Sequence, residues 1–333
     1  MKKVARIRVV QVGLGPLGQR IVKMALQRDG IRIVAAVDTD EAKIGRDVGL
    51  LSGAPRLGVR VERSLASALR GRGADVAVLA TVSELRALEP QVAALARAGL
   101  PVVSTCEELS YPWRTAPAVS RRIDAVCKKH GVACVGTGVN PGFLMDFLPA
   151  VLSSVCGRVD KVTVRRFQDA SVRRVPFQEK IGAGLTPAEF RARVAAGKLR
   201  HVGLTESMHM MAAALGWKLT RTTESLRAIR AVRAIASGYK PIEKGMACGV
   251  EQVGRGYLGP REAIRLHFRA AVGEPASFDE VEIEGLPGLK SRVEGGVNGD
   301  LATCAVVLNA LHAVADASPG LHTMIDLPLP SCR

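Results

Sequence analysis

The feature that most constrains the fold of this chain is a glycine-rich turn close to its start. Residues 4–12 (VARIRVVQV) form an apolar, β-branched run that predicts a strand buried on both faces, and GLGPLG at residues 13–18 follows directly. The next residues have helical spacing, which stops at Gly30. A second apolar run, residues 31–37, ends at Asp38, which stands 20 positions after the last glycine of the turn. This order of strand, turn, helix, strand and acid predicts a dinucleotide-binding Rossmann unit.

Each residue of the turn has a physical task in that interpretation. Gly13 permits the tight turn, Gly15 lets backbone amides approach a pyrophosphate at the positive helix N-terminus, and Gly18 allows close packing of helix on strand. Pro16 and Leu17 complete the predicted cofactor-binding loop. The alternative is a plain glycine turn between a strand and a helix.

Asp38 bears on which dinucleotide binds. Its carboxylate is expected to accept hydrogen bonds from the adenosine ribose and would repel a ribose 2′-phosphate, which favours NAD over NADP. Thr39, Lys43 and Arg46 lie nearby in the sequence and could weaken that repulsion, so use of both cofactors stays open. Ala80-Thr81 ends the next predicted strand and is expected to line the cofactor cleft, because ligands of such sheets bind at the carboxyl ends of strands.

Predicted strands and helices alternate over the first 142 residues. This alternation predicts a doubly wound parallel sheet of the α/β class. The further strands are expected at residues 74–80, 101–105 and 131–136, and the further helices at 90–98 and 115–129.

The pattern changes after residue 142. Clustered strands without helices between them predict a second domain of the α+β type. An apolar helix over residues 299–316 is expected to return to the first domain, so the predicted domains are 1–142, 143–298 and 299–333. In the second domain we expect helices at 143–155, 186–197 and 205–215, strands at 159–167, 246–253, 262–272 and 278–284, and a polar loop at 168–184.

Composition argues against several other classes. The formal net charge is +16, but the arginines are scattered, aromatic residues make up 4%, and no RNA-binding motif occurs, so no specific nucleic-acid partner is expected. The seven cysteines are widely spaced without a C-x-x-C pair, which predicts neither a disulfide framework nor a metal site. No stretch approaches the ~18 apolar residues of a membrane helix, and the N-terminus lacks a signal-cleavage pattern, so we expect a cytoplasmic protein without membrane contact.

Two adjacent carboxylates follow another predicted strand at the same sheet edge. Glu107 and Glu108 come directly after Ser104-Thr105-Cys106, where they would stand near a nicotinamide. A helix N-terminus is the alternative interpretation, because Ser or Thr followed by acidic residues is a common helix start. Spacing alone does not decide between catalysis and capping.

Six segments of the chain, in order, resemble one family. They are STCEELSYP, GTGVNPGFLMD, DASVRRVPFQEKIGAG, HVGLTES, GGVNGDLAT and PGLHTMIDLP, and the likeness runs from Val9 to Pro328. Together they resemble the 2,4-diaminopentanoate dehydrogenases, whose close relatives include native amine dehydrogenases and whose distant relatives include dihydrodipicolinate reductase. The resemblance implies a Rossmann domain, a substrate and dimerisation domain that forms a homodimer, and NAD(P)-linked oxidative deamination that is reversible with ammonia.

The resemblance also assigns roles to single residues. The family's catalytic carboxylate falls in STCEELSYP, which puts Glu107 first and Glu108 second. Oxidation of the amine leaves a cationic iminium, which a nearby carboxylate stabilises while also serving as a general base. The segment around Asn140 lines the nicotinamide and substrate cleft in the family, so Asn140 is a candidate for binding either one, and Asn298 is a weaker candidate. Cys106 is expected to be a packing residue.

The polar loop at residues 168–184 bears on the substrate. Basic side chains of the kind found there suit a substrate carboxylate, although a solvated charged loop is the alternative. The resemblance implies a less basic stretch in relatives that take simple alkyl ketones, so we expect an amino-acid-like diamine such as 2,4-diaminopentanoate. His201 is either a pocket residue or a structural histidine. The candidate substrate-binding residues of the loop are Arg173, Arg174, Gln178 and Lys180.

Three other functions stay open beside this one. They are an amine dehydrogenase for simple alkyl amines, an imine or dihydrodipicolinate-type reductase, and a non-catalytic NAD-sensing regulator that binds DNA through its basic surface. The reductase is disfavoured because the chain lacks paired histidines and a K-D-A-P-S-G-T motif. A regulator would not need STCEELSYP near the nicotinamide. We therefore expect an enzyme that uses a small-molecule amine or ketone, ammonia and NAD or NADP.

Overall fold

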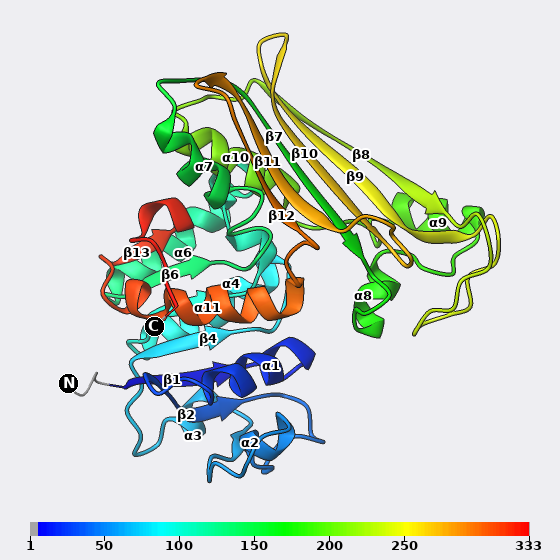
Figure 1. Ribbon diagram of the computed structural model, residues 1–333. Coiled ribbons are helices and arrows are strands. Elements are labelled where there is room, and N and C mark those ends of the chain that lie inside the picture. Colours follow the sequence, from blue (N-terminus) through cyan, green and yellow to red (C-terminus); the bar gives the residue numbers. More distant parts are fainter. Residues whose placement is uncertain (1–5, 333) are drawn as a thin grey trace. The chain divides into compact units, whose positions relative to one another are not determined.

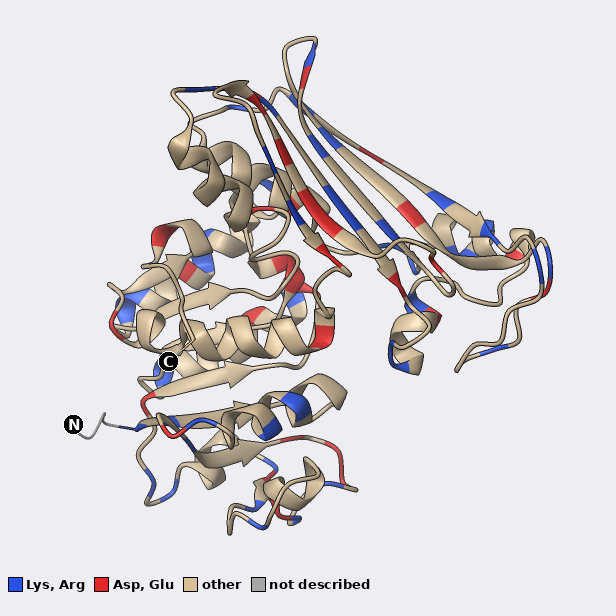
Figure 2. Cartoon of the chain, viewed as in Figure 1, with Lys and Arg blue, Asp and Glu red and all other residues tan. Residues whose placement is uncertain are grey.

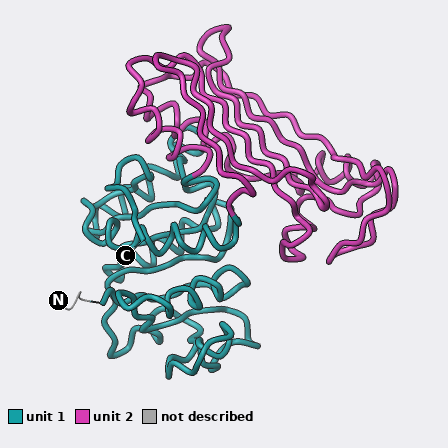
Figure 3. The backbone as a smooth tube through the Cα atoms, viewed as in Figure 1, with its two compact units in different colours: residues 1–143, 298–333 teal, residues 144–297 magenta. Residues whose placement is uncertain are grey.

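The computed structural model describes residues 6–332, and the chain divides into two compact units. Unit 1 comprises residues 1–143 and 298–333, and unit 2 comprises residues 144–297 (Figure 3). The domain boundaries expected after residues 142 and 298 each differ by one residue from these divisions. The roles expected of these domains, in binding the dinucleotide, binding the substrate and forming a dimer, stay predictions.

A seven-stranded parallel sheet forms the centre of unit 1 (Figure 1). Its strand order is β13-β6-β5-β4-β1-β2-β3, so the chain starts in the interior at β1, winds to β3, and then winds the other way from β4. This topology confirms the predicted doubly wound α/β class. The strands are β1 (Ile7–Val12), β2 (Ile31–Val37), β3 (Val61–Glu62), β4 (Val76–Leu79), β5 (Val102–Ser104), β6 (Ala133–Gly136) and β13 (Gly320–His322).

Two layers of helices cover this sheet. Strand residues such as Val10 and Val102 point into a core that α4 and α6 complete, and these two helices contact each other. Alternate residues such as Val9 and Val78 point to the opposite face. Helices α1 and α11 contact each other in the second layer. The helices of unit 1 are α1 (Pro16–Ala25), α2 (Val48–Leu51), α3 (Leu65–Ala68), α4 (Leu85–Arg97), α5 (Pro112–Thr115), α6 (Pro117–Lys129) and α11 (Gly299–Ala315), with 3₁₀ turns η1 (Glu107–Leu109) and η3 (Met324–Asp326).

A six-stranded mixed sheet forms the centre of unit 2, in the order β12-β11-β7-β10-β9-β8. Strands β7 and β10 run parallel, and all the other pairs are antiparallel. The strands are β7 (Arg158–Asp169), β8 (Arg221–Arg230), β9 (Ala247–Leu258), β10 (Arg261–Ala271), β11 (Phe278–Leu286) and β12 (Leu289–Glu294). The helices are α7 (Phe147–Leu152), α8 (Val175–Lys180), α9 (Pro187–Ala195) and α10 (Leu204–Ala214), with the 3₁₀ turn η2 (Ser153–Val155).

The two faces of the unit 2 sheet have opposite character. One face is apolar, carries Val164, Leu266 and Phe268, and contacts α10. Alternate residues on the same strands form the other face, which we call the charged face, where blue and red stripes run along the strands in Figure 2. The charged face is made by Lys161, Arg165, Arg227, Glu251, Arg255, Arg265, His267, Arg269, Glu280, Glu282, Glu284, Lys290 and Arg292.

Several elements differ from those predicted. The segment 168–184 is not a continuous loop, because it contains α8 and because β7 runs on to Asp169. Helix α4 begins at Leu85 and holds Pro90 in its interior, although a proline was expected to mark the helix start. Strand β8 was missed because it lies at the sheet edge with polar residues on both faces, which hides the alternation. Val4 and Ala5 of the first predicted strand lie outside the described residues.

Among residues 6–332, none of the helices is both long and apolar enough to span a membrane. Over the same residues, no group of three or more His, Cys, Asp and Glu side chains is arranged to hold a metal ion.

Candidate functional site

The glycine loop between β1 and α1 is packed so tightly that two of its glycines are required. Gly13 has a φ of +87°, and a Cβ there would lie 2.4 Å from the carbonyl oxygen of Ala80 and 2.8 Å from Cγ2 of Thr81. A Cβ on Gly18 would lie 2.1 Å from the carbonyl oxygen of Gly13. The loop therefore rests directly on Ala80-Thr81, as predicted for the ends of neighbouring strands. The side-chain amide of Gln11 anchors the loop by donating to the Gly13 carbonyl oxygen at 2.9 Å.

Gly15 is a glycine for a different reason. Its φ of −64° suits any residue, and a Cβ added there would meet nothing within 4 Å. Packing within the chain therefore does not demand glycine at this position, whereas a pyrophosphate lying against the backbone would. Gly15 is the N-cap of α1 and has no side chain to cap the first amides, and Pro16 begins the helix with half-buried Leu17 after it. The loop fits a dinucleotide.

Asp38 lies beside this loop, directly after β2. Its Oδ2 atom accepts a hydrogen bond from the Leu14 amide at 2.6 Å and lies 3.3 Å from the Lys43 ammonium. Its Oδ1 atom accepts from the Asp40 amide at 2.9 Å. The carboxylate that was predicted from sequence to meet the adenosine ribose is thus held against the glycine loop, and it carries a basic partner.

The two glutamates after β5 differ in their contacts. Both are half-buried in η1. The Glu108 carboxylate accepts from the Leu85 amide at 2.8 Å, and so caps the N-terminus of α4. The Glu107 carbonyl oxygen accepts from the Ser110 amide and from its hydroxyl, at 3.2 and 2.8 Å, which fixes the turn that carries Glu107. The sequence left open a cap on the helix that follows Ser104, whereas the cap observed is on α4, which precedes Glu108 in the chain.

Cys106 precedes these glutamates and is buried. Its thiol donates to the Ser83 carbonyl oxygen at 3.1 Å. Burial, with the charges of Glu107 and Glu108 adding to it, raises the pKa of Cys106 to about 12. The side chain is a neutral thiol at pH 7, which agrees with a packing role.

The two asparagines predicted to line the cofactor or substrate site have different surroundings. Asn298 is the N-cap of α11, and its Oδ1 atom accepts from the Asp300 and Leu301 amides, both at 3.1 Å. Asn140 is half-buried, and the segment before it is tied to α11 because the Val139 amide donates to the Thr303 hydroxyl at 3.2 Å. Helix capping explains why an asparagine stands at position 298, whereas Asn140 stays a candidate for binding the cofactor or the substrate.

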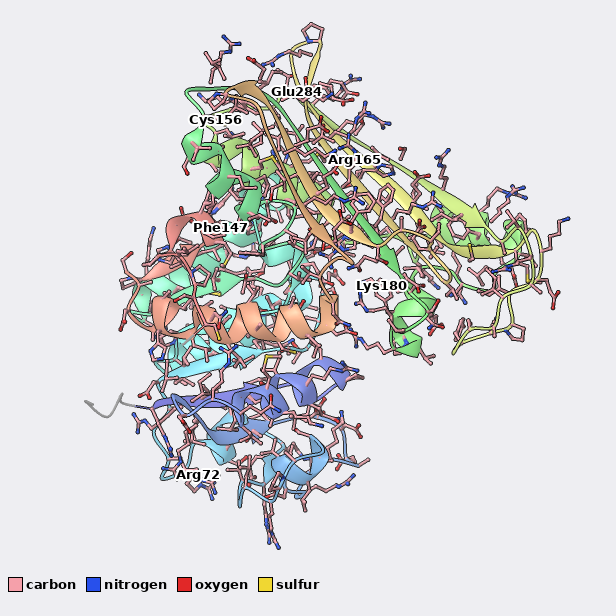
Figure 4. The ribbon with its side chains drawn as sticks, viewed as in Figure 1. Arg72, Phe147, Cys156, Arg165, Lys180 and Glu284 are labelled. Atoms are coloured by element: carbon pink, nitrogen blue, oxygen red, sulfur yellow. The ribbon has the colours of Figure 1, made fainter. Side chains whose placement is uncertain are left out.

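In unit 2, the segment before and within α8 is held by Gln178. The buried amide of Gln178 donates to the Ala170 and Arg173 carbonyl oxygens, both at 3.0 Å, and accepts from the Gly238 amide at 3.0 Å. These contacts to backbone give Gln178 a structural task. Arg174 is the half-buried N-cap of α8, and Lys180 lies exposed on the last turn of that helix (Figure 4).

A buried arginine that the sequence analysis did not single out lies on the apolar face of the same sheet. Arg166 on β7 is 2% exposed, pairs with Asp279 on β11 at 3.2 Å, and donates to the Val297 carbonyl oxygen at 3.0 Å. Burial lowers the pKa of Arg166 to about 10 and raises the pKa of Asp279. The sequence spacing could have predicted that Arg166 is buried. It follows Val162 and Val164 at intervals of two along a strand and so shares their buried face.

Arg166 belongs to a set of basic groups around His201. His201 is half-buried with its Nδ1 atom inside, and its ring centroid lies 4.3 Å from that of Phe268. Burial and then the charges of Lys180, Arg166 and Arg173 lower the pKa of His201 to about 3, so the ring is neutral at pH 7. Arg173 donates to Gln168 at 2.9 Å and lies 4.0 Å over the Phe177 ring. We call this set, Arg166, Arg173, Lys180 and His201, the basic cluster.

Comparisons with known proteins agree with both units. Residues 143–333 match the family model of the 2,4-diaminopentanoate dehydrogenase C-terminal domain, and residues 7–106 match that of the dihydrodipicolinate reductase N-terminus. The 2,4-diaminopentanoate dehydrogenase of Acetoanaerobium sticklandii is 31% identical over 98% of this chain and 94% of its own length. An amine dehydrogenase of Streptomyces virginiae is 25% identical over 97% of this chain and 96% of its own length.

A solved structure extends this likeness to the fold. The amine dehydrogenase from Mycobacterium smegmatis superposes with a TM-score of 0.88 at 27% identity, covering 100% of this chain and 99% of its own. The resemblance drawn from six sequence segments is confirmed by these matches.

Proposed function

Because the chain belongs to the 2,4-diaminopentanoate dehydrogenase family, we propose that it is an NAD(P)-dependent amine dehydrogenase. It oxidises the carbon that bears a primary amine, and hydrolysis of the resulting iminium gives a ketone and ammonia. The same groups run the reverse reaction, reductive amination. The observation that carries this proposal is that the glycine loop, Asp38 and the glutamate pair each follow directly after a strand of one parallel sheet.

Unit 1 supplies the dinucleotide site in this proposal. The backbone of Gly13, Gly15 and Gly18 with the N-terminus of α1 would hold the pyrophosphate, and Asp38 would hold the adenosine ribose. Ala80-Thr81 packs against Gly13 and lines the same strand ends. When bound, the nicotinamide supplies the hydride acceptor. The chain itself has to hold the ring, position the amine and move protons.

Glu107 is proposed as the catalytic carboxylate. The substrate enters as an ammonium, and a base must remove a proton before hydride can leave the neighbouring carbon. Once Glu107 has passed that proton to solvent, the regenerated carboxylate opposes the positive charge of the iminium and takes a proton from the attacking water. Glu108 is already committed to the Leu85 amide, so its replacement is expected to affect folding more than chemistry.

The basic cluster of unit 2 supports a substrate that carries a carboxylate. Guanidinium groups bind carboxylates in a bidentate manner, and Arg166 and Arg173 bring two of them to one place. Neutral His201 could donate a further hydrogen bond from its ring. The sequence predicted Arg173 and Lys180 for this role, with Arg174 and Gln178, and predicted His201 as a pocket or structural residue; Arg166 is added here. An amino-acid-like amine such as 2,4-diaminopentanoate is therefore proposed over a simple alkyl amine.

A matched pair of amines tests the reaction and the substrate class together. In 4-aminopentanoate and 2-aminopentane the reacting carbon is the same, and only the first has a carboxylate. We expect kcat/KM to be at least about tenfold higher for 4-aminopentanoate, the effect of one charge-assisted contact. Equal values would favour the simple alkyl amines. Dinucleotide binding without turnover of any amine would favour the regulator, and reduction of ketone or imine without ammonium would favour the reductase.

A homodimer built on the charged face is also proposed. Acidic and basic side chains alternate across that face. Glu280, for example, pairs with three basic residues, Arg165, Lys290 and Arg292, at 2.7, 3.0 and 3.2 Å. Arg165 and Glu284 mark its position in Figure 4. A face of mixed sign is complementary to itself across a two-fold axis. Light scattering should give twice the monomer mass at low salt, with weaker association in high salt, and a monomer at micromolar concentration would contradict the proposal.

The cytoplasm stays the proposed location.

A further inference from the structure

We propose that Lys43 binds the 2′-phosphate of NADP and thereby lets this chain use both dinucleotides. The inference rests on the dinucleotide site proposed above and assigns a specificity role to one residue of it. Asp38 by itself favours NAD, because a carboxylate repels a phosphate at the ribose that it binds. The environment of this carboxylate decides whether that preference holds.

Lys43 neutralises Asp38 at close range. Its ammonium lies 3.3 Å from Oδ2 of Asp38, the oxygen that also accepts from the Leu14 amide of the glycine loop. The same ammonium lies 3.2 Å from Oδ2 of Asp40. A cation therefore lies beside the carboxylate proposed to bind the ribose, and it is shared between two acids.

A short turn holds the lysine in this place. The Lys43 amide donates to the Asp40 carbonyl oxygen at 2.9 Å, and the Ala42 amide donates to the Asp40 carboxylate at 3.0 Å. The turn folds the chain back so that the lysine stem returns to Asp38. The Lys43 side chain is 20% exposed, which leaves its ammonium within reach of a ligand.

The charges around Lys43 allow its ammonium to move from Asp40 to a phosphate. Burial lowers the pKa of Lys43, but hydrogen bonds to Asp40 and Asp38 outweigh it and raise the pKa overall, so the lysine stays charged. The Asp40 side chain is 49% exposed, and an exposed ion pair contributes little to stability. The lysine can exchange Asp40 for a phosphate at small cost, because its long stem allows several positions for the ammonium.

The neighbouring cations are less suited to this task. Arg63 is engaged with Glu41, with a 2.6 Å hydrogen bond between them on the surface. Arg46 is exposed, and its position follows the turn rather than lying within it. Lys43 contacts the ribose-binding carboxylate directly, which makes it the residue to test.

The experiment measures dissociation constants of NAD and NADP for the full-length protein by calorimetry, without substrate. The variants are Lys43→Met, which keeps the stem and removes the charge, and Lys43→Arg, which keeps the charge. We expect Lys43→Met to weaken NADP by about tenfold, the size of one lost charge-assisted contact, and NAD by less than about threefold. Lys43→Arg should keep NADP within about threefold of the wild type.

Asp40→Asn is the matched control. It frees Lys43 from its exposed partner and should strengthen NADP by a few fold, with NAD unchanged. An unchanged NADP constant in Lys43→Met, or equal losses for NAD and NADP, would overturn the proposal. A wild-type protein that binds neither dinucleotide would overturn the dinucleotide site itself, and one that binds NAD but not NADP would overturn only the role of Lys43.

Discussion

In unit 1 the polar groups proposed to act stand at the carboxyl ends of parallel strands, whereas in unit 2 the set includes Arg166, which lies within a strand on the buried face of a sheet. Asp38 and Glu107 follow β2 and β5, outside the bounds of those strands. Arg166 and Asp279 belong to β7 and β11 and contact each other inside the core. A side chain at a strand end can change without disturbing packing, but one inside the core cannot.

The difference leads to a general expectation for variants. Changes to Asp38 and Glu107 in unit 1 should alter cofactor preference or rate more than they alter stability. Changes to the buried polar groups of unit 2 should alter stability together with substrate binding.

Glu107→Gln should lower kcat by about 10²–10⁴-fold, the usual contribution of general acid–base catalysis. Gln keeps the shape of the side chain but removes the charge that opposes the iminium. The melting temperature and the dinucleotide dissociation constant should barely change. Steady-state kinetics with 4-aminopentanoate, thermal unfolding and a binding titration measure the three quantities.

Glu108→Gln is the matched control for Glu107→Gln. It replaces the carboxylate that accepts from the Leu85 amide, so it should cost about 1 kcal/mol of unfolding free energy and little kcat. If both variants keep more than about a tenth of the wild-type kcat, less than acid–base catalysis supplies, neither glutamate is the catalytic group. If only Glu108→Gln loses activity, the assignment of the two residues is reversed.

Arg166→Met should lower the free energy of unfolding by about 3–5 kcal/mol, because Asp279 then stays buried without its cation. Urea denaturation measures the loss. The double variant Arg166→Met with Asp279→Asn should recover part of it, because the remaining buried charge is removed as well. A loss below about 1 kcal/mol in the single variant is the size expected of an exposed pair. It would contradict the prediction that Asp279 stays buried without its cation.

Acid should destabilise the protein through His201. Its pKa is lowered to about 3 in the folded chain, so below the unfolded value of about 6.5 only the unfolded state takes up the proton. Stability from this group is fully present at pH 7 and is lost as the pH falls from 6.5 toward 3. Between pH 7 and pH 5 the loss is about 2 kcal/mol. His201→Gln should remove that part of the pH dependence in urea titrations, and an unchanged slope would place the acid sensitivity elsewhere.

Asp38→Ala should shift cofactor preference toward NADP by about tenfold, because hydrogen bonds to the ribose are lost and the repulsion of phosphate is removed. The measurement is the ratio of kcat/KM for NAD and NADP. The variant also removes the acceptor of the Leu14 and Asp40 amides, so a loss of about 1–2 kcal/mol of unfolding free energy is expected beside the change in preference. The same ratio in variant and wild type would mean that Asp38 does not contact the ribose.

Local patterns were sufficient for the strand ends of unit 1. The glycine loop, Asp38 and the glutamate pair each form part of a contiguous stretch in which a strand, a turn and the functional residue follow one another. Parallel strands align their carboxyl ends, so the sequence also predicted that these stretches share one edge. The same reasoning recovered β2 at its observed bounds and the clustered strands of an α+β unit 2, apart from β8 and β12.

Local patterns failed where a neighbour along the sheet or a distant turn decides the outcome. Strand β8 is an edge strand, so its sequence lacks the apolar alternation that reveals a half-buried strand. Helix α4 starts ahead of its internal proline, and the first amide of that helix has its partner in Glu108, a residue from another turn. Gln178 looked like a substrate ligand, but its amide is taken up by backbone groups of two separate segments.

By itself the sequence determined the class of the fold, the dinucleotide loop, the acid beside it and the pair of glutamates in which the catalytic group is sought. Only the tertiary structure decided that Glu108 is a helix cap and that Arg166 pairs with Asp279 in the core. The physical reason is the range of the contacts. Turn geometry and strand alternation arise among residues a few positions apart, whereas a cap or a buried ion pair exists only after sheet register has brought distant residues together.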